Sequence, residues 1–125
     1  MSVRSERINV TGWPRSGQLL LLAPLRTEAH ALRRGSATAA VHISGGGRRR
    51  SERTARQIPQ LVAGHQAVAV AGFCGAVDSD LAPGDLFVAS VVRAVDGQET
   101  AIPGAAMLAG ELRRAGSSVG SGTLL

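Results

Sequence analysis

Continuous apolar runs along the chain predict strands. The runs cover residues 18–23, 37–43, 67–71, 86–95 and 119–125. Most of them show little alternation of apolar and polar residues, which is typical of strands buried on both faces of a sheet. Such strands occur mainly in sheets that are covered by other layers.

Three segments with helical periodicity lie between these runs. The first covers residues 27–34, with Thr27 as its expected N-cap. The second begins near Arg48 and has Ala55 on its apolar face, and the third begins at Pro103. Alternating strands and helices predict an α/β protein with three layers, in which helices flank a mostly parallel central sheet.

The two ends of the chain differ from its middle. Residues 1–17 mix Ser, Arg, Asn, Thr and Gly without a period, which predicts a flexible lead-in. Residues 18–125 are expected to form a single domain. Because its last predicted strand is followed by no helix, we expect this domain to be incomplete, with one sheet face uncovered.

Composition restricts the class of protein. Hydrophobic residues make up 44% of the chain, which excludes a wholly disordered protein. Trp13, Phe73 and Phe87 are the only aromatic residues, so the core must be built from Ala, Val and Leu. A net charge of +5 suits a polyanionic partner but does not by itself identify one.

The reactive side chains exclude further classes. Cys74 is the only cysteine, so the chain has no internal disulfide, and we expect a cytoplasmic location. No stretch approaches the ~20 apolar residues of a membrane span, so no membrane partner is expected. His30, His42 and His65 are scattered along the sequence and predict no metal site.

Three segments with glycine or proline turns follow predicted strands. They are Leu20–Ala29 (LLLAPLRTEA), Ile43–Gly47 (ISGGG) and Val70–Val88, which contains VAGFCGAV and then LAPGDLFV. In order and spacing they resemble the N-terminal portion of the superfamily of purine nucleoside phosphorylases and methylthioadenosine/adenosylhomocysteine nucleosidases. The resemblance implies a phosphorylase/hydrolase-like fold. It also implies cleavage of the N-glycosidic bond of a nucleoside, with phosphate or water attacking the anomeric carbon.

Glu28 is the candidate catalytic residue that the resemblance implies. In the nucleosidases the glutamate at the matching place activates water, which needs a base because water is a weak nucleophile at neutral pH. The alternative for Glu28 is an ordinary first-turn glutamate that the helix dipole stabilises. Glu28 favours hydrolysis, whereas Arg26 leaves phosphorolysis open.

Two groups of residues would bind the substrates. Those beside the base and the sugar are Gly72, Phe73, Cys74 and Gly75. Those that would contact phosphate are Arg26, Gly45, Gly46 and Gly47. Glycine-rich turns after buried strands let backbone amides approach an anion. The alternative is that the glycines only permit tight turns and that Arg26 is a solvated surface residue.

Phe73 departs from the family, many members of which carry serine or threonine there. We expect Phe73 either to stack on a base or to lie in the core. Cys74 matches no catalytic role and is expected to pack. The family's second half supplies an acid for the departing purine and a segment that grips the ribose, and Asp78, Asp80 and Asp85 do not match that acid. We therefore expect this chain alone to have little activity.

The resemblance implies no resident cofactor, with inorganic phosphate as the co-substrate in the phosphorolytic alternative. It also implies homo-oligomers, which are usual in the family. Two rival hypotheses stay open. Arg48–Arg50, Arg53 and Arg56 could bind a nucleic-acid backbone, although the shortage of aromatic residues leaves little for base stacking. The chain could also be a structural fragment whose last strand completes a partner's sheet.

Overall fold

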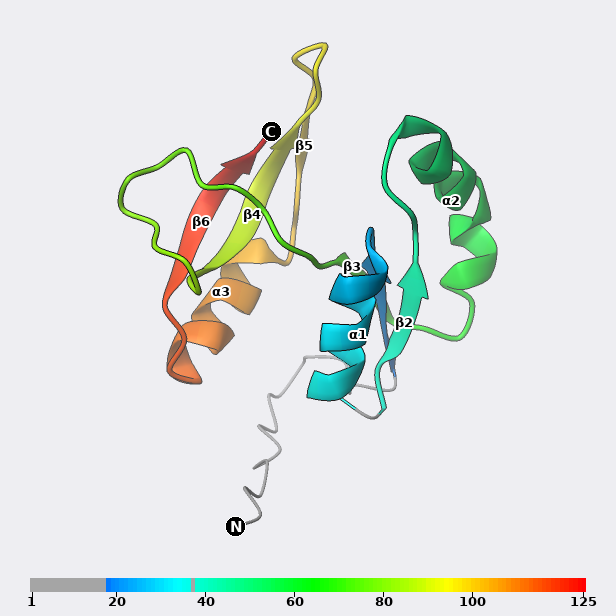
Figure 1. Cartoon of the computed structure of the whole chain (residues 1–125), viewed down its shortest axis with the longest axis horizontal. Coiled ribbons are helices and arrows are strands. Elements are labelled where there is room, and N and C mark those ends of the chain that lie inside the picture. The colour runs from blue at the N-terminus through cyan, green and yellow to red at the C-terminus, as the bar shows by residue number, and fades with distance from the viewer. Residues whose placement is uncertain (1–17, 37) are drawn as a thin grey trace. The chain divides into compact units, whose positions relative to one another are not determined.

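A computed structural model of the chain describes residues 18–36 and 38–125 (Figure 1). The predicted lead-in at residues 1–17 lies outside the described residues. The elements are β1 (Leu19–Ala23), α1 (Arg26–Gly35), β2 (Ala40–Ile43), α2 (Arg48–Leu61), β3 (Ala67–Val70), β4 (Leu86–Arg93), β5 (Glu99–Ala101), α3 (Ala105–Arg114) and β6 (Val119–Leu124). They form two compact units, one ending at Cys74 and the other covering Gly75–Leu125.

The first unit contains α1, α2 and a parallel three-stranded sheet in the order β2-β1-β3. Leu20 of β1 is opposite Ala40 of β2 on one side and Val68 of β3 on the other. The connections through α1 and α2 are the crossovers that parallel neighbours require. Because β2 and β3 lie on opposite sides of β1, the strand order reverses between β1 and β3. In α/β sheets such a switch point is where ligands bind, at the carboxyl ends of the strands.

The core of this unit centres on β1. Leu20, Leu22 and Ala23 are buried, as is Ala29 of α1, which packs against β1 and β2. The prediction of a strand buried on both faces therefore fits β1 in part, because Leu20 and Leu22 on one face and Ala23 on the other are buried, whereas Leu19 and Leu21 are half-buried. It does not fit β3, whose Val68 and Val70 side chains are 45% and 72% exposed. The difference follows from position, since β1 is the central strand and β3 is at the edge of the sheet.

Each helix differs from the prediction in one detail, and α3 begins at Ala105 rather than at Pro103. Helix α1 begins at Arg26, so its N-cap is Leu25 rather than Thr27. Leucine offers no side-chain acceptor to the N–H groups of the first turn, and the contact found at this end is the reverse one, in which Glu28 Oε2 accepts the N–H of Leu25 itself at 2.8 Å. In α2, Ala55 is exposed, and the buried residue is Thr54, whose Oγ1 donates to the Ser44 carbonyl at 3.0 Å.

The second unit is a mixed sheet in the order β5-β4-β6. β4 is parallel to β6 and antiparallel to β5. Helix α3 connects β5 to β6 and packs against β4 and β6, with Ala105 and Ala109 buried. The outer side of β6 is an unpaired edge among the described strands, which is the feature that sheet completion by a partner would need.

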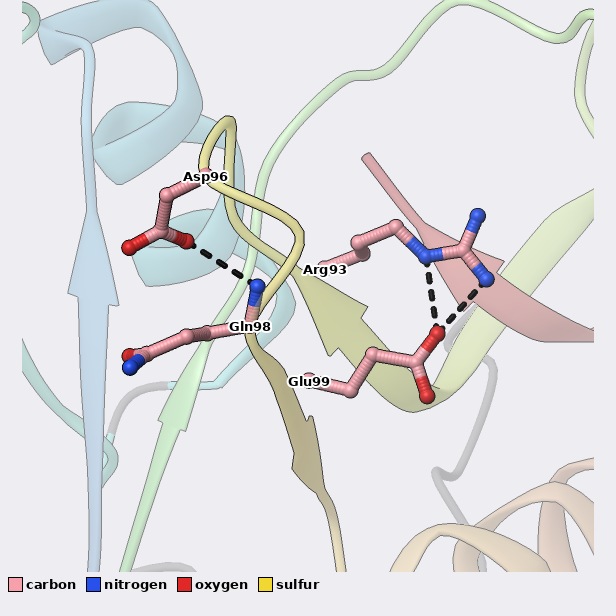
Figure 2. Close-up of polar contacts among 4 residues, drawn as sticks. All are labelled: Arg93, Asp96, Gln98 and Glu99. Atoms are coloured by element: carbon pink, nitrogen blue, oxygen red, sulfur yellow. Dashed lines mark hydrogen bonds and ion pairs between the residues drawn. The ribbon is translucent and has the colours of Figure 1, made fainter.

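Strand β5 was not predicted. It forms a hairpin with β4, and Figure 2 shows the polar contacts at the turn. Arg93 pairs with Glu99, with Nε at 2.8 Å from Oε1, and Asp96 Oδ1 accepts the Gln98 N–H at 3.0 Å. Gly97 has a φ of +87°, which glycine adopts readily. The Asp-Gly pair is a known hairpin signal that could have identified this turn.

The structure confirms an α/β protein with mostly parallel strand pairing. It differs from the prediction of one central sheet, because the strands are divided between two three-stranded sheets. Residues 71–85, between β3 and β4, contain no helix or strand. An apolar run shows that a segment can form a strand, but it does not show which neighbour that strand will pair with.

Candidate functional site

The predicted site residues of the first unit follow the carboxyl ends of its three strands. Arg26 and Glu28 come after β1, Gly45–Gly47 come after β2, and Gly72–Cys74 come after β3. The loops after β2 and β3 are held to β1 by backbone bonds. The Ser44 N–H donates to the Ala23 carbonyl at 2.9 Å, and the Ala71 N–H donates to the Leu22 carbonyl at 3.0 Å. The parallel register therefore brings the three loops together at the carboxyl ends of the strands.

Glu28 lies at the switch point and connects two of these loops. Its side chain is buried, at 5% exposure. Oε2 accepts the Leu25 N–H before α1, and Oε1 accepts the Phe73 N–H after β3, each at 2.8 Å. Leu25 and Phe73 are remote in sequence, so this carboxylate joins the start of α1 to the loop after β3. We call Glu28, Gly72 and Phe73 the switch-point corner.

Gly72 is required by the position of the Glu28 carboxylate. A Cβ at residue 72 would lie 2.6 Å from Oε1 and 2.8 Å from Cδ of Glu28. The φ of Gly72 is not positive, so the need for glycine here is one of space rather than of backbone conformation. Gly75 differs, since a Cβ there would meet nothing within 4 Å, and it begins the second unit.

Phe73 and Cys74 are both exposed. The Phe73 side chain is 79% exposed although its backbone N–H is fixed by Glu28. The core alternative for Phe73 and the packing role expected for Cys74 are therefore wrong for this structure. The physical reason is that both residues lie in the irregular segment after β3, where the alternation of a strand no longer turns side chains inward. An exposed ring beside a fixed backbone is available for stacking.

A second feature lies at the carboxyl end of β2. Arg26, Ser44, Gly45, Arg50, Arg53 and Gln57 are among the residues that line an open hollow of about 330 Å³. We call it the arginine hollow. It brings together Arg26 and Gly45, two of the residues predicted to contact phosphate, whereas Gly46 and Gly47 are not in its lining. Arg50 and Arg53 were predicted only as part of a basic run. Their spacing of three, after a glycine turn, is the signal that places both on one helix face.

The second unit has a smaller hollow of about 240 Å³ lined by Asp78, Asp80 and Asp85. Two of these carboxylates accept backbone N–H groups of their own loop. Asp78 Oδ1 accepts from Asp80, and Asp85 Oδ2 accepts from Ala82, each at 2.9 Å. Aspartates used in this way shape turns. This arrangement accounts for Asp78 and Asp85 without a catalytic role.

The Glu28 carboxylate at the switch-point corner has hydrogen-bonding positions that its two backbone bonds do not use. A carboxylate offers about four lone-pair positions, and the two backbone bonds of Glu28 use one on each oxygen. A water molecule or a hydroxyl group could donate to a remaining position. The corner therefore combines a fixed carboxylate with an exposed aromatic ring.

Comparison of the chain with models of protein families, with curated proteins and with solved structures gives no significant match in any of the three. In the part of the chain that the structure describes, no helix has the length and apolar character needed to cross a bilayer.

Proposed function

We propose that this chain carries the N-terminal part of a nucleoside phosphorylase-like or nucleosidase-like domain, whose chemistry is cleavage of the N-glycosidic bond. The observation that supports it best is the Glu28 carboxylate, which joins the loops after β1 and β3 at the switch point of a parallel sheet. These are two of the loops on which the resemblance rests. A ligand at the carboxyl ends of β1 and β3 would meet both.

In this proposal Glu28 orients the nucleophile and accepts its proton. Its backbone bonds hold the carboxylate in one place, which is what a base needs in order to act on a water molecule beneath the ribose. Phe73 supplies a face on which the base can stack. Because Gly72 has no side chain, the Glu28 carboxylate and the loop after β3 can lie close to each other.

Bond cleavage also needs a proton for the departing base. Among the described residues of the first unit the other carboxylate is Glu52, which is on α2 and pairs with Arg48 at 2.8 Å. It is engaged in an exposed ion pair outside the switch-point corner. We therefore expect the chain by itself to bind a nucleoside but to release its base little faster than the uncatalysed reaction.

The test measures binding and turnover of the full chain with adenosine, inosine and methylthioadenosine, with and without phosphate. We expect saturable binding of at least one nucleoside and negligible base release. Phe73→Ala should weaken this binding by about tenfold, because stacking on an aromatic ring is worth about 1–3 kcal/mol per base.

The matched control is Val77→Ala, which shortens another exposed apolar side chain in the same irregular segment. It should leave nucleoside affinity unchanged. If no nucleoside binds saturably, or if the two variants weaken binding equally, the proposed function is wrong.

A further inference from the structure

We propose that helix α2 binds the sugar–phosphate backbone of a duplex nucleic acid through a stripe of arginines. The stripe consists of Arg49, Arg53 and Arg56, which follow one another at i, i+4 and i+7 along α2. At about 100° per residue, these positions fall within about 60° of one another around the helix axis. We call these three residues the arginine stripe. Its role does not depend on the proposed nucleoside site.

The arginine stripe lies on the side of α2 that is turned away from the rest of the unit. Packing holds the other side, on which Thr54 is buried and Ile58 and Leu61 are half-buried. These three residues repeat the i, i+4, i+7 spacing, and by helix geometry they lie about 140° around the axis from the stripe. All three arginines of the stripe are exposed. A partner can therefore reach them without displacing α2 from the unit.

The charge on α2 is unbalanced. The helix carries five arginines and one acidic residue, Glu52. Glu52 pairs with Arg48 at 2.8 Å. The other ion pairs among the described residues lie in the second unit. The arginine stripe therefore has no acidic partner in the part of the chain that the structure describes.

This distribution of charge works against the helix itself. Arg53 is one turn from both Arg49 and Arg56, and like charges at these spacings destabilise a helix. The first turn contains three arginines and no acidic residue, although the helix dipole favours negative charge there. The N-cap residue, Gly47, provides no side-chain hydrogen bond. Sequences that break several local rules at one place do so mainly at functional surfaces, and an anionic partner would remove this conflict.

The shape of the arginine stripe selects among anionic partners. It extends about 10 Å along the helix axis, so it presents a row of charges rather than a site for one small anion. A nucleic-acid strand offers a matching row of phosphates. A membrane surface fits less well, because an interfacial helix inserts its apolar face into the lipid, and the apolar side of α2 is the side that packs in the unit.

The residues of α2 also favour a duplex over a single strand. Proteins that bind single strands combine basic side chains with aromatic rings on which unpaired bases stack. Helix α2 contains no aromatic residue. Contact with the backbone of a duplex requires only cations and hydrogen-bond donors, so binding is expected to be independent of base sequence.

The experiment measures binding of the full chain to a short, fluorescently labelled DNA duplex of mixed sequence, by anisotropy over a range of salt concentrations. We expect saturable binding that weakens as salt rises. The variant R49Q/R53Q/R56Q should lower the affinity at low salt by about tenfold or more. It should also reduce the slope of log affinity against log salt by about 2–3, because each lost phosphate contact removes about 0.9 from that slope.

The matched control is R34Q/R93Q/R114Q, which removes the same charge from exposed arginines on α1, β4 and α3. It should lower the affinity by less than about threefold and change the salt slope by less than about 1. Glu52→Gln should raise the affinity by about twofold, because it removes the one negative charge of α2 and releases Arg48.

Each remaining outcome overturns the proposal. Equal effects of the two triple variants would show that only net charge matters, and a lack of saturable duplex binding would show that no such surface exists. Tighter binding of a single-stranded oligonucleotide, or of vesicles that contain phosphatidylserine, would identify a different partner. Thermal unfolding checks the fold, and R49Q/R53Q/R56Q should unfold at the same or a higher temperature because it removes repulsion within α2. If that variant is unstable, Glu52→Gln decides, and unchanged affinity overturns the proposal.

Discussion

A Gly72→Ala variant is expected to lose about 1–3 kcal/mol of unfolding free energy, the usual cost of overpacking. The added Cβ would lie 2.6 Å from Glu28 Oε1, and the Phe73 N–H next to it already donates to that oxygen. Space can therefore be made only by moving the carboxylate or the loop, and either movement weakens this bond. Urea unfolding followed by circular dichroism measures the loss.

The matched control for this variant is Gly75→Ala. A Cβ at residue 75 would meet nothing within 4 Å, and its φ is not positive, so stability should be unchanged or raised by up to about 1 kcal/mol. A double-mutant cycle identifies the partner. The cost of Gly72→Ala should be smaller by at least about 0.5 kcal/mol in a Glu28→Ala background, because the clashing atoms are then absent. An equal cost in both backgrounds would show that Glu28 is not what limits residue 72.

Glu28→Ala is expected to reduce the unfolding free energy by about 2–4 kcal/mol. The variant leaves the N–H groups of Leu25 and Phe73 without an acceptor, and each such loss costs about 1–3 kcal/mol when the group is kept from water. Glu28→Gln should cost about half as much, since its amide keeps one acceptor oxygen and turns a donor toward the other N–H. The same urea unfolding experiment measures both variants.

Glu52→Ala is the control for the removal of a glutamate. Its carboxylate pairs with Arg48 on the exposed side of α2, where such pairs contribute about 0–1 kcal/mol. We expect the largest loss for Glu28→Ala, a smaller loss for Glu28→Gln and the smallest for Glu52→Ala. Equal losses for Glu28→Ala and Glu52→Ala would show that the bridge between the two loops contributes nothing.

Much of the secondary structure could be predicted because the apolar runs are distinct. The run at residues 18–23 is β1, and the helix expected from Arg48 is α2. The missed strand β5 has only three residues, all exposed, so it has no hydrophobic pattern. It forms because the turn at Gly97 directs the chain back along β4. Such a strand is predicted from the residues of the turn and not from apolar periodicity.

Features that depend on distant residues could not be predicted in the same way. The N-cap of α1 is Leu25, whose N–H donates to Glu28, and Glu28 is held in turn by the Phe73 N–H. That contact exists only because β1 and β3 are neighbours. The division into two sheets was missed for a related reason, since apolar runs do not encode strand partners.

The candidate site was predictable in part. Glu28 and Gly72 were selected by resemblance, and the structure places them in contact. That Arg26 and Arg50 line one hollow was not predicted, because it depends on how the loops are arranged after the strands end.

The proposed nucleoside site lies at the carboxyl ends of β1 and β3, around Glu28. The most direct test is to record backbone amide chemical shifts of the full chain while adenosine and then phosphate are added. We predict saturating shifts at residues 25–28 and 71–74, together with loss of those shifts in Gly72→Ala. If no amide shifts saturably, or if the shifts are confined to Gly75–Leu125, the nucleoside site at the switch point does not exist.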